Sequence, residues 1–207
     1  MTHALTVDAV MDLAPVIPVL VIDRVEDAVP VARALVAGGL PALEVTLRTP
    51  VALEVIRAMA EVEGAVVGAG TVLNMEQLDA ALEAGARFVV SPGLTPSLGR
   101  EAVASGVPFL PGVANAADIM TGLDLGLSRF KFFPAMAAGG LPALKALAAP
   151  FHQARFCPTG GISAANAAEW LAQPFVGCVG GSWIVPRGPV DEAAITAAAR
   201  AACALRG

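Results

Sequence analysis

This chain of 207 residues has few histidines and cysteines, and it has no nucleotide-binding motif. It has two histidines and three cysteines, and the cysteines stand far apart at Cys157, Cys178 and Cys203. That spacing forms neither a disulfide framework nor a CxxC metal site. No cluster of histidine and aspartate follows a predicted strand, and neither a GxGxxG run with an acidic ribose ligand nor a Walker loop occurs. We therefore expect no metal, no cofactor and thiols that stay reduced.

Charged residues are also few, at 15% of the chain, and the net charge of −5 argues against a nucleic-acid partner. The composition is 56% hydrophobic with a mean hydropathy of +0.70. Long uncharged stretches such as 132–144 and 170–186 are broken by glycine and proline, so they predict no membrane-spanning helix. The apolar segment 13–22 is short, contains two prolines and follows an acidic segment, unlike a signal peptide. We expect a cytoplasmic protein without a membrane partner.

Lysine occurs only twice, and Lys131 lies in the aromatic run 129–134, which is typical of a buried strand. Burial strips water from an ammonium group and favours the neutral amine. A neutral amine in a dry pocket can attack a ketone and form a Schiff base. The alternative is a lysine whose stem packs on the phenylalanines while its amine reaches water.

Short apolar runs alternate with helical patterns along the whole chain. The runs are 16–22, 43–48, 66–71, 88–91, 109–113, 129–133, 155–158 and 175–179. Helical patterns include 51–62, 75–84, 116–125, 164–172 and 191–205. Eight strand–helix units predict a single α/β domain over 1–207, folded as a parallel (β/α)8 TIM barrel. A doubly wound open sheet is the alternative, although it usually has fewer strands.

Capping residues support these helix boundaries. Glycines at 38–39, 85, 106 and 126 predict helix ends in the left-handed conformation. Asn74, Asn115 and Ser163 are predicted to cap helix N-termini.

In a barrel, the chemistry belongs at the carboxyl ends of the strands. Alternation along 43–48 sends Glu44, Thr46 and Arg48 to one face, which should point into the barrel because the other face is apolar. The sequence thus predicts a carboxylate inside the barrel and a guanidinium nearer its mouth. A purely structural Glu–Arg pair is the alternative.

Two glycine pairs lie at neighbouring strand ends. Gly160 and Gly161 follow the seventh predicted strand, while Gly180, Gly181 and Ser182 close the eighth. Bare backbone N–H groups at such loops bind anions, and these loops often hold phosphate in barrels. Each pair could instead mark only a tight turn. Together they predict a phosphorylated small molecule as the ligand.

Several segments resemble the signatures of the KDPG/KHG aldolase family. The two strongest are the segments 39–48 (GLPALEVTLR) and 126–134 (GLSRFKFFP). The resemblance continues through 67–73, 91–94, 156–162 and 180–183, in unbroken order over nearly the whole chain. The family's enzymes are class I aldolases that cleave 2-keto-3-deoxy-6-phosphogluconate or 4-hydroxy-2-oxoglutarate. The loop 135–140 is less polar than the family pattern, which leaves the preferred aldehyde open.

The resemblance implies a role for each matching residue. Lys131 would be the Schiff-base lysine and Glu44 the general acid/base. Arg48 and Thr71 would hold the substrate carboxylate, and Pro92 and Phe133 would form the pocket wall. Thr159 would contact the substrate near its reacting end. The phosphate would be held by Gly160, Gly161 and Ser182, with the adjoining Gly180 and Gly181.

The expected reaction is cleavage of 2-dehydro-3-deoxy-6-phosphogluconate to pyruvate and glyceraldehyde 3-phosphate. The shorter 4-hydroxy-2-oxoglutarate and the galactonate epimer stay open as substrates. Two rivals also remain: a phosphate-binding barrel isomerase or decarboxylase in which Lys131 is only electrostatic, and a phospho-sugar sensor. The family commonly forms trimers, so a homotrimer is expected.

Overall fold

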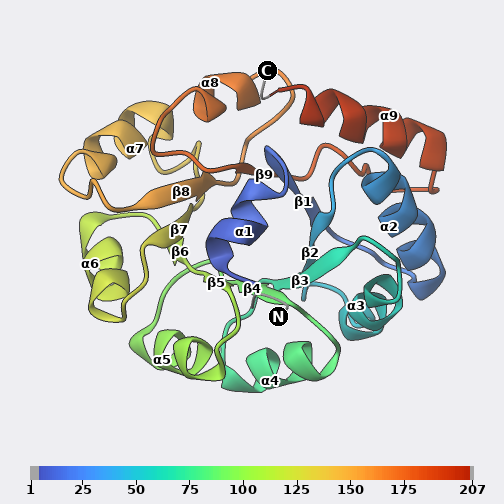
Figure 1. The fold of residues 1–207 in the computed structure, drawn as a ribbon, viewed down its shortest axis with the longest axis horizontal. Helices are drawn as coiled ribbons and strands as arrows, with labels where there is room; N and C mark the ends of the chain where they lie inside the picture. The colour runs from blue at the N-terminus through green and yellow to red at the C-terminus, as the bar shows by residue number, and fades with distance from the viewer. Residues whose placement is uncertain (1–4, 206–207) are drawn as a thin grey trace.

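The computed structural model describes residues 5–205, so the two ends of the predicted domain lie outside the described residues. Strands and helices alternate after a first short helix (Figure 1). The strands are β1 (Val16–Leu20), β2 (Ala42–Thr46), β3 (Val66–Gly70), β4 (Phe88–Val90), β5 (Phe109–Leu110), β6 (Gly112–Val113), β7 (Arg129–Phe132), β8 (Arg155–Pro158) and β9 (Val179–Gly181). The α-helices are α1 (Val7–Asp12), α2 (Ala28–Ala37), α3 (Ala52–Ala60), α4 (Met75–Glu83), α5 (Pro96–Ser105), α6 (Ala116–Asp124), α7 (Gly140–Ala148), α8 (Ala167–Leu171) and α9 (Glu192–Cys203), with a 3₁₀ turn, η1 (Val25–Asp27), before α2.

All strand pairings are parallel, which confirms the predicted α/β class. Six strands form one sheet in the order β5-β4-β3-β2-β1-β9, and three form another in the order β6-β7-β8. Helices surround this curled arrangement of strands on the outside (Figure 1). The carboxyl ends of all the strands therefore lie on one side of the molecule.

The two sheets approach each other at both of their edges. On one side only Pro111 separates β5 from β6, and the predicted strand 109–113 is divided there because proline has no N–H to donate. Its carbonyl still accepts a hydrogen bond from the Lys131 backbone N–H at 2.8 Å. On the other side, isolated bridges join Phe156 to Val176 and Thr159 to Gly180.

Two separate apolar clusters lie on the two faces of the strands. The larger cluster fills the space between strands and helices and includes Phe130, Phe132 and Phe156. The smaller one lies inside the curl and includes Ile17 and Phe88. Further inward residues of the smaller cluster are Ala42, Val90, Leu110, Cys157 and Cys178. Alternating residues thus face opposite ways, as the pleat of a strand requires.

Helix α1 has no counterpart among the predicted helices and lies across the centre of the strands in Figure 1. Its Val10 and Met11 are buried in the inner cluster. Asp8 forms ion pairs with Arg129 and Arg155 at the start of β7 and β8. The helix thus covers the amino ends of the strands, and the carboxyl ends are the side on which a site can open.

Most predicted boundaries agree with the structure. Gly39, Gly85, Gly106 and Gly126 have positive φ after helices, as predicted. Asn74 and Asn115 accept hydrogen bonds from the backbone N–H groups of residues 77 and 118, as N-caps do.

Two predicted boundaries were wrong. Ser163 does not cap α8: the Asn166 side chain instead accepts a hydrogen bond from the Ser163 N–H, and the helix begins at residue 167. The last strand is not 175–179 but β9, because pairing with β1 begins at Val179 and Val176 makes only an isolated bridge. Among the described residues, no helix combines the length and apolarity needed to cross a membrane.

Candidate active site

A buried lysine and a buried glutamate meet near the carboxyl ends of β7 and β2. Lys131 Nζ lies 3.1 Å from Glu44 Oε1, within hydrogen-bonding and ion-pair distance. The side chains are only 7% and 3% exposed, respectively. Eighty-seven residues separate the two in sequence. Both predicted catalytic residues are therefore brought into contact by the fold, away from bulk water.

Strand alternation explains why both side chains point inward. In β7, Phe130 and Phe132 belong to the outer apolar cluster, so Lys131 between them faces the other way. In β2, Leu43 and Val45 likewise face the helices and leave Glu44 inside. The alternation predicted for residues 43–48 is confirmed, and the structure shows the same alternation in β7.

Phe133 lies directly after β7 and contacts the amine from a second side. Its ring centroid is 5.2 Å from Lys131 Nζ, a cation–π distance. Within residues 5–205, the carboxylate of Glu44 and this ring are the polar and aromatic partners of the amine. An amine held between a proton acceptor and an aromatic wall can exchange a proton with Glu44 and still attack a carbonyl carbon.

Arg48 extends from the end of β2 and is anchored by a threonine. Its Nε donates a hydrogen bond to Thr46 Oγ1 at 3.1 Å, and the Thr46 hydroxyl donates to the Leu20 carbonyl at 2.8 Å. Arg48 is exposed, whereas Thr46 is buried. Thr46 belongs to the same alternating set as Glu44 and Arg48, but no role was predicted for it. Its position in that alternation was the signal available in the sequence.

Thr71 and Pro92 occupy the ends of β3 and β4. Thr71 has φ of 61°, which is unusual for a β-branched residue and costs on the order of 1–3 kcal/mol. Strained backbone of this kind clusters at functional sites. Pro92 follows β4, and its carbonyl comes so near Gly112 that a Cβ on that glycine would lie 2.1 Å from it. Both predicted residues thus lie at the same end of the strands as Lys131.

The two glycine loops meet beside Thr159. A bridge pairs Thr159 with Gly180, and a Cβ on Gly180 would lie 2.2 Å from Thr159 Oγ1. Gly160 and Gly161 have φ of 101° and 77°, which favour glycine. Two further predicted residues belong to the neighbouring strand end: Gly181 is buried in β9, and Ser182 follows it and is exposed.

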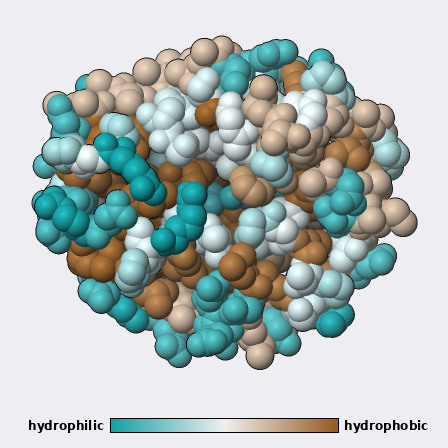
Figure 2. Space-filling view, turned by 180° about the vertical axis from the view of Figure 1, so that it is seen from behind, coloured by the Kyte–Doolittle hydropathy of each residue, from teal (hydrophilic) through white to brown (hydrophobic). Residues whose placement is uncertain are grey.

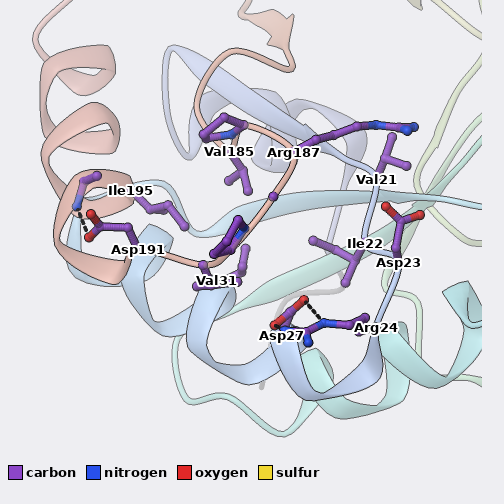
Figure 3. Close-up of a pocket in the computed structure, with 15 residues that line it drawn as sticks. Val21, Ile22, Asp23, Arg24, Asp27, Val31, Val185, Arg187, Asp191 and Ile195 are labelled. Carbon is purple, nitrogen blue, oxygen red and sulfur yellow. Dashed lines mark hydrogen bonds and ion pairs between the residues drawn. The ribbon is translucent and has the colours of Figure 1, made fainter.

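The space-filling view from behind Figure 1, opposite α1, shows hydrophobic surface between groups of hydrophilic side chains around the centre (Figure 2). A separate pocket of about 390 Å³ lies between the loops after β1 and β9 (Figure 3). Ile22, Val31 and Ile195 contribute apolar lining, and none of the predicted site residues lines it. This pocket is therefore distinct from the Lys131–Glu44 contact.

Two charged residues at the edge of this pocket form an ion pair. Arg24 donates two hydrogen bonds to Asp27, at 3.0 and 2.7 Å (Figure 3). The hydrogen bonds and charge of Arg24 lower the pKa of Asp27, and Asp27 raises the pKa of Arg24. No group of His, Cys, Asp and Glu side chains within residues 5–205 is arranged to hold a metal ion.

Comparison with known proteins adds a family to this geometry. Residues 7–200 match the family described as KDPG and KHG aldolase. The chain belongs to this family. The 2-dehydro-3-deoxy-phosphogluconate aldolase of Zymomonas mobilis subsp. mobilis is 64% identical over 200 residues, covering 97% of this chain and 96% of that protein. The predicted resemblance is confirmed.

Two solved structures of family members are similar over nearly their full length. The Zymomonas mobilis 2-keto-3-deoxy-6-phosphogluconate aldolase with 3-phosphoglycerate has a TM-score of 0.95 at 64% identity, covering 96% of this chain and 95% of that chain. The Legionella pneumophila KDPG aldolase, with pyruvate captured as a covalent carbinolamine intermediate, has a TM-score of 0.93 at 47% identity, covering 96% and 98%. Both proteins share the arrangement of strands and helices seen here.

Proposed function

We propose that this protein is a class I aldolase that cleaves 2-dehydro-3-deoxy-6-phosphogluconate to pyruvate and glyceraldehyde 3-phosphate. The observation that carries the proposal is the buried contact between Lys131 Nζ and Glu44 Oε1. The Legionella relative supports it, since pyruvate is bound there as a carbinolamine. The Zymomonas relative, with 3-phosphoglycerate, supports a phosphorylated substrate.

The reaction needs an amine and a proton carrier, and no metal enters this scheme. Lys131 Nζ attacks C2 of the keto acid, and loss of water gives an iminium. The electrons of the C3–C4 bond then move into the iminium while the C4 hydroxyl loses its proton, which releases the aldehyde and leaves an enamine. Protonation at C3 and addition of water at C2 release pyruvate and restore the amine. Glu44 moves the protons in these steps, because its carboxylate is 3.1 Å from the amine.

The remaining site residues hold the substrate in this proposal. Arg48 offers a planar fork to the pyruvate carboxylate, assisted by Thr71. Pro92 and Phe133 form the pocket wall, and Thr159 contacts the reacting end. The phosphate binds the glycine loops and the hydroxyl that follows them, at Gly160, Gly161, Gly180, Gly181 and Ser182. The positive φ values of Gly160 and Gly161 support an anion-binding backbone there.

We further propose that the two sheets act as one barrel of eight strands within a single domain, since only Pro111 interrupts them on one side and isolated bridges join them on the other. A cytoplasmic homotrimer without cofactor remains our expectation. Exposed apolar side chains at Leu73, Met75, Met120 and Met136 support an association of subunits. The other substrates to assay are 4-hydroxy-2-oxoglutarate and the galactonate epimer.

Borohydride reduction in the presence of pyruvate, followed by peptide mass spectrometry, tests the proposal. We expect a stable adduct on Lys131 and none on Lys145, the exposed lysine of α7, which serves as an internal control. Lys131→Arg should abolish both the adduct and turnover, because a guanidinium cannot form the iminium. Glu44→Gln should slow turnover while leaving the adduct detectable. A folded protein without an adduct on Lys131 would refute the Schiff-base mechanism.

A further inference from the structure

We propose that Thr46 is a positioning residue that fixes the Arg48 guanidinium for the substrate carboxylate. This inference rests on the proposed function, in which Arg48 binds the carboxylate of pyruvate. Thr46 is buried in β2, and its hydroxyl contacts both the Leu20 carbonyl of the neighbouring strand β1 and the Arg48 side chain.

The two hydrogen bonds of Thr46 define the direction of its hydroxyl. The hydroxyl has a single hydrogen, and the Leu20 carbonyl at 2.8 Å accepts it. The oxygen lone pairs are then left for Arg48 Nε–H at 3.1 Å. Because Thr46 is only 2% exposed, water does not compete freely for this oxygen. The acceptor offered to Arg48 is therefore held in place by the adjoining strand β1.

This contact determines which edge of the guanidinium faces a ligand. Arginine has five N–H donors in a planar fork, and one of them, Nε–H, is used by Thr46. Among the described residues, Nη1 and Nη2 of Arg48 have no protein hydrogen-bond partner. A carboxylate can then be bound end-on by the two terminal nitrogens, in the bidentate manner that such pairs favour. An exposed arginine without this anchor would lose more side-chain entropy on binding.

A second threonine, Thr49, offers a control that distinguishes a positioning role of Thr46 from a purely structural one. Thr49 Oγ1 donates a hydrogen bond to the carbonyl of Ile22, in the loop after β1, at 2.9 Å. Thr46 makes the same kind of bond to Leu20, the last residue of β1. Among the described residues, Thr49 makes no contact with Arg48 in the hydrogen-bond network. Thr49→Val therefore removes a comparable tie without releasing the arginine, and it is the matched control.

The experiment measures the pyruvate concentration that gives half-maximal borohydride trapping on Lys131, together with KM and kcat for condensation of pyruvate with glyceraldehyde 3-phosphate. Thr46→Val, which keeps the shape of the side chain, should raise half-saturation and KM for pyruvate by about 10-fold, the worth of a hydrogen bond to a charged group. The change in kcat should stay within about threefold, because Arg48 lies outside the bond-breaking step. Thr46→Ser and Thr49→Val should stay within about twofold of the wild type.

A double-mutant cycle completes the test. If Thr46 acts through the arginine, Thr46→Val should have no further effect on pyruvate in an Arg48→Ala background. The proposal is overturned if Thr46→Val binds pyruvate as the wild type does, or if it weakens binding equally with and without Arg48. Melting temperatures establish folding. Thr46→Cys, which replaces the hydroxyl by a weakly accepting thiol and lacks the threonine methyl, takes the place of a Val variant that does not fold. Absence of any adduct in the wild type would instead refute the proposed function itself.

Discussion

Gly70, the last residue of β3, is the position at which one methyl group should disturb the site most directly. It pairs with Thr46 in register, and a Cβ built on it would lie 2.3 Å from Glu44 Oε1 and 2.6 Å from Glu44 Cγ. Its φ is not positive, so alanine is acceptable to the backbone. The clash therefore falls on the glutamate side chain and not on the strand.

The size of the displacement follows from these distances. Ordinary van der Waals contact begins at 3.4 Å, so Oε1 must move by about 1 Å in Gly70→Ala. The same oxygen lies 3.1 Å from Lys131 Nζ, so the movement breaks or bends that hydrogen bond. A misplacement of about 1 Å in a catalytic group can reduce the rate about 100-fold. Overpacking of the buried site should lower stability by about 1–3 kcal/mol.

The assay is kcat for release of pyruvate from 2-dehydro-3-deoxy-6-phosphogluconate, with pyruvate trapping on Lys131 measured in parallel. We expect kcat to fall about 100-fold while the adduct still forms, since the lysine is untouched. Glu44→Asp, which shortens the acid by one methylene, should restore part of the rate only in the Gly70→Ala background. Gly93→Ala, where the added Cβ meets nothing within 4 Å, is the control. A rate within about threefold of wild type would refute the steric argument.

Three further predictions concern other parts of the structure. Gly180→Ala should push on Thr159 Oγ1 and raise KM for the phosphorylated substrate on the order of 10-fold in steady-state assays. Met11→Ala should cost about 2–5 kcal/mol in urea unfolding and leave KM unchanged, because this fully buried residue lies on α1 at the opposite end of the strands. The lowered pKa of Asp27 beside Arg24 stabilises the fold above the ordinary pKa of an aspartate, and the gain is lost as pH falls through the lowered value. The difference in Tm between wild type and Asp27→Asn should therefore shrink on acidification, and an unchanged difference would contradict the ion pair.

The parts of the fold that depend on local alternation were predictable from the sequence. Along 43–48 the apolar residues alternate with Glu44, Thr46 and Arg48, and this pattern alone indicated which face turns inward. For β7, the aromatic run around Lys131 predicted a buried strand but not the direction of the lysine side chain. The structure confirms the inward direction of Glu44, which meets Lys131. Which side chains of a strand point inward follows from the alternation within that strand, so it can be predicted without knowing the partner strand.

Features that depend on distant contacts were not predictable in the same way. Helix α1 is short, and its place depends on distant contacts: Val10 and Met11 pack into the inner cluster, and Asp8 forms ion pairs with two arginines of β7 and β8. The position of β9 is decided by its pairing with β1 at the other end of the chain, which moves the strand away from the apolar run 175–179. In both cases the residues that determine the structure lie far away in the sequence from the helix or strand itself.

The glycines show most clearly why a site needs both kinds of information. In the sequence, Gly160–Gly161 and Gly180–Gly181 look alike, and both suggested a phosphate loop. In the structure the first pair has positive φ values and the second does not. Gly180 and Gly181 instead leave room for Thr159 and the Trp183 ring, at 2.2 and 1.9 Å from a built Cβ. Backbone conformation thus favours the first pair as the main anion contact, whereas a substitution at Gly180 should act through Thr159 and one at Gly181 through Trp183.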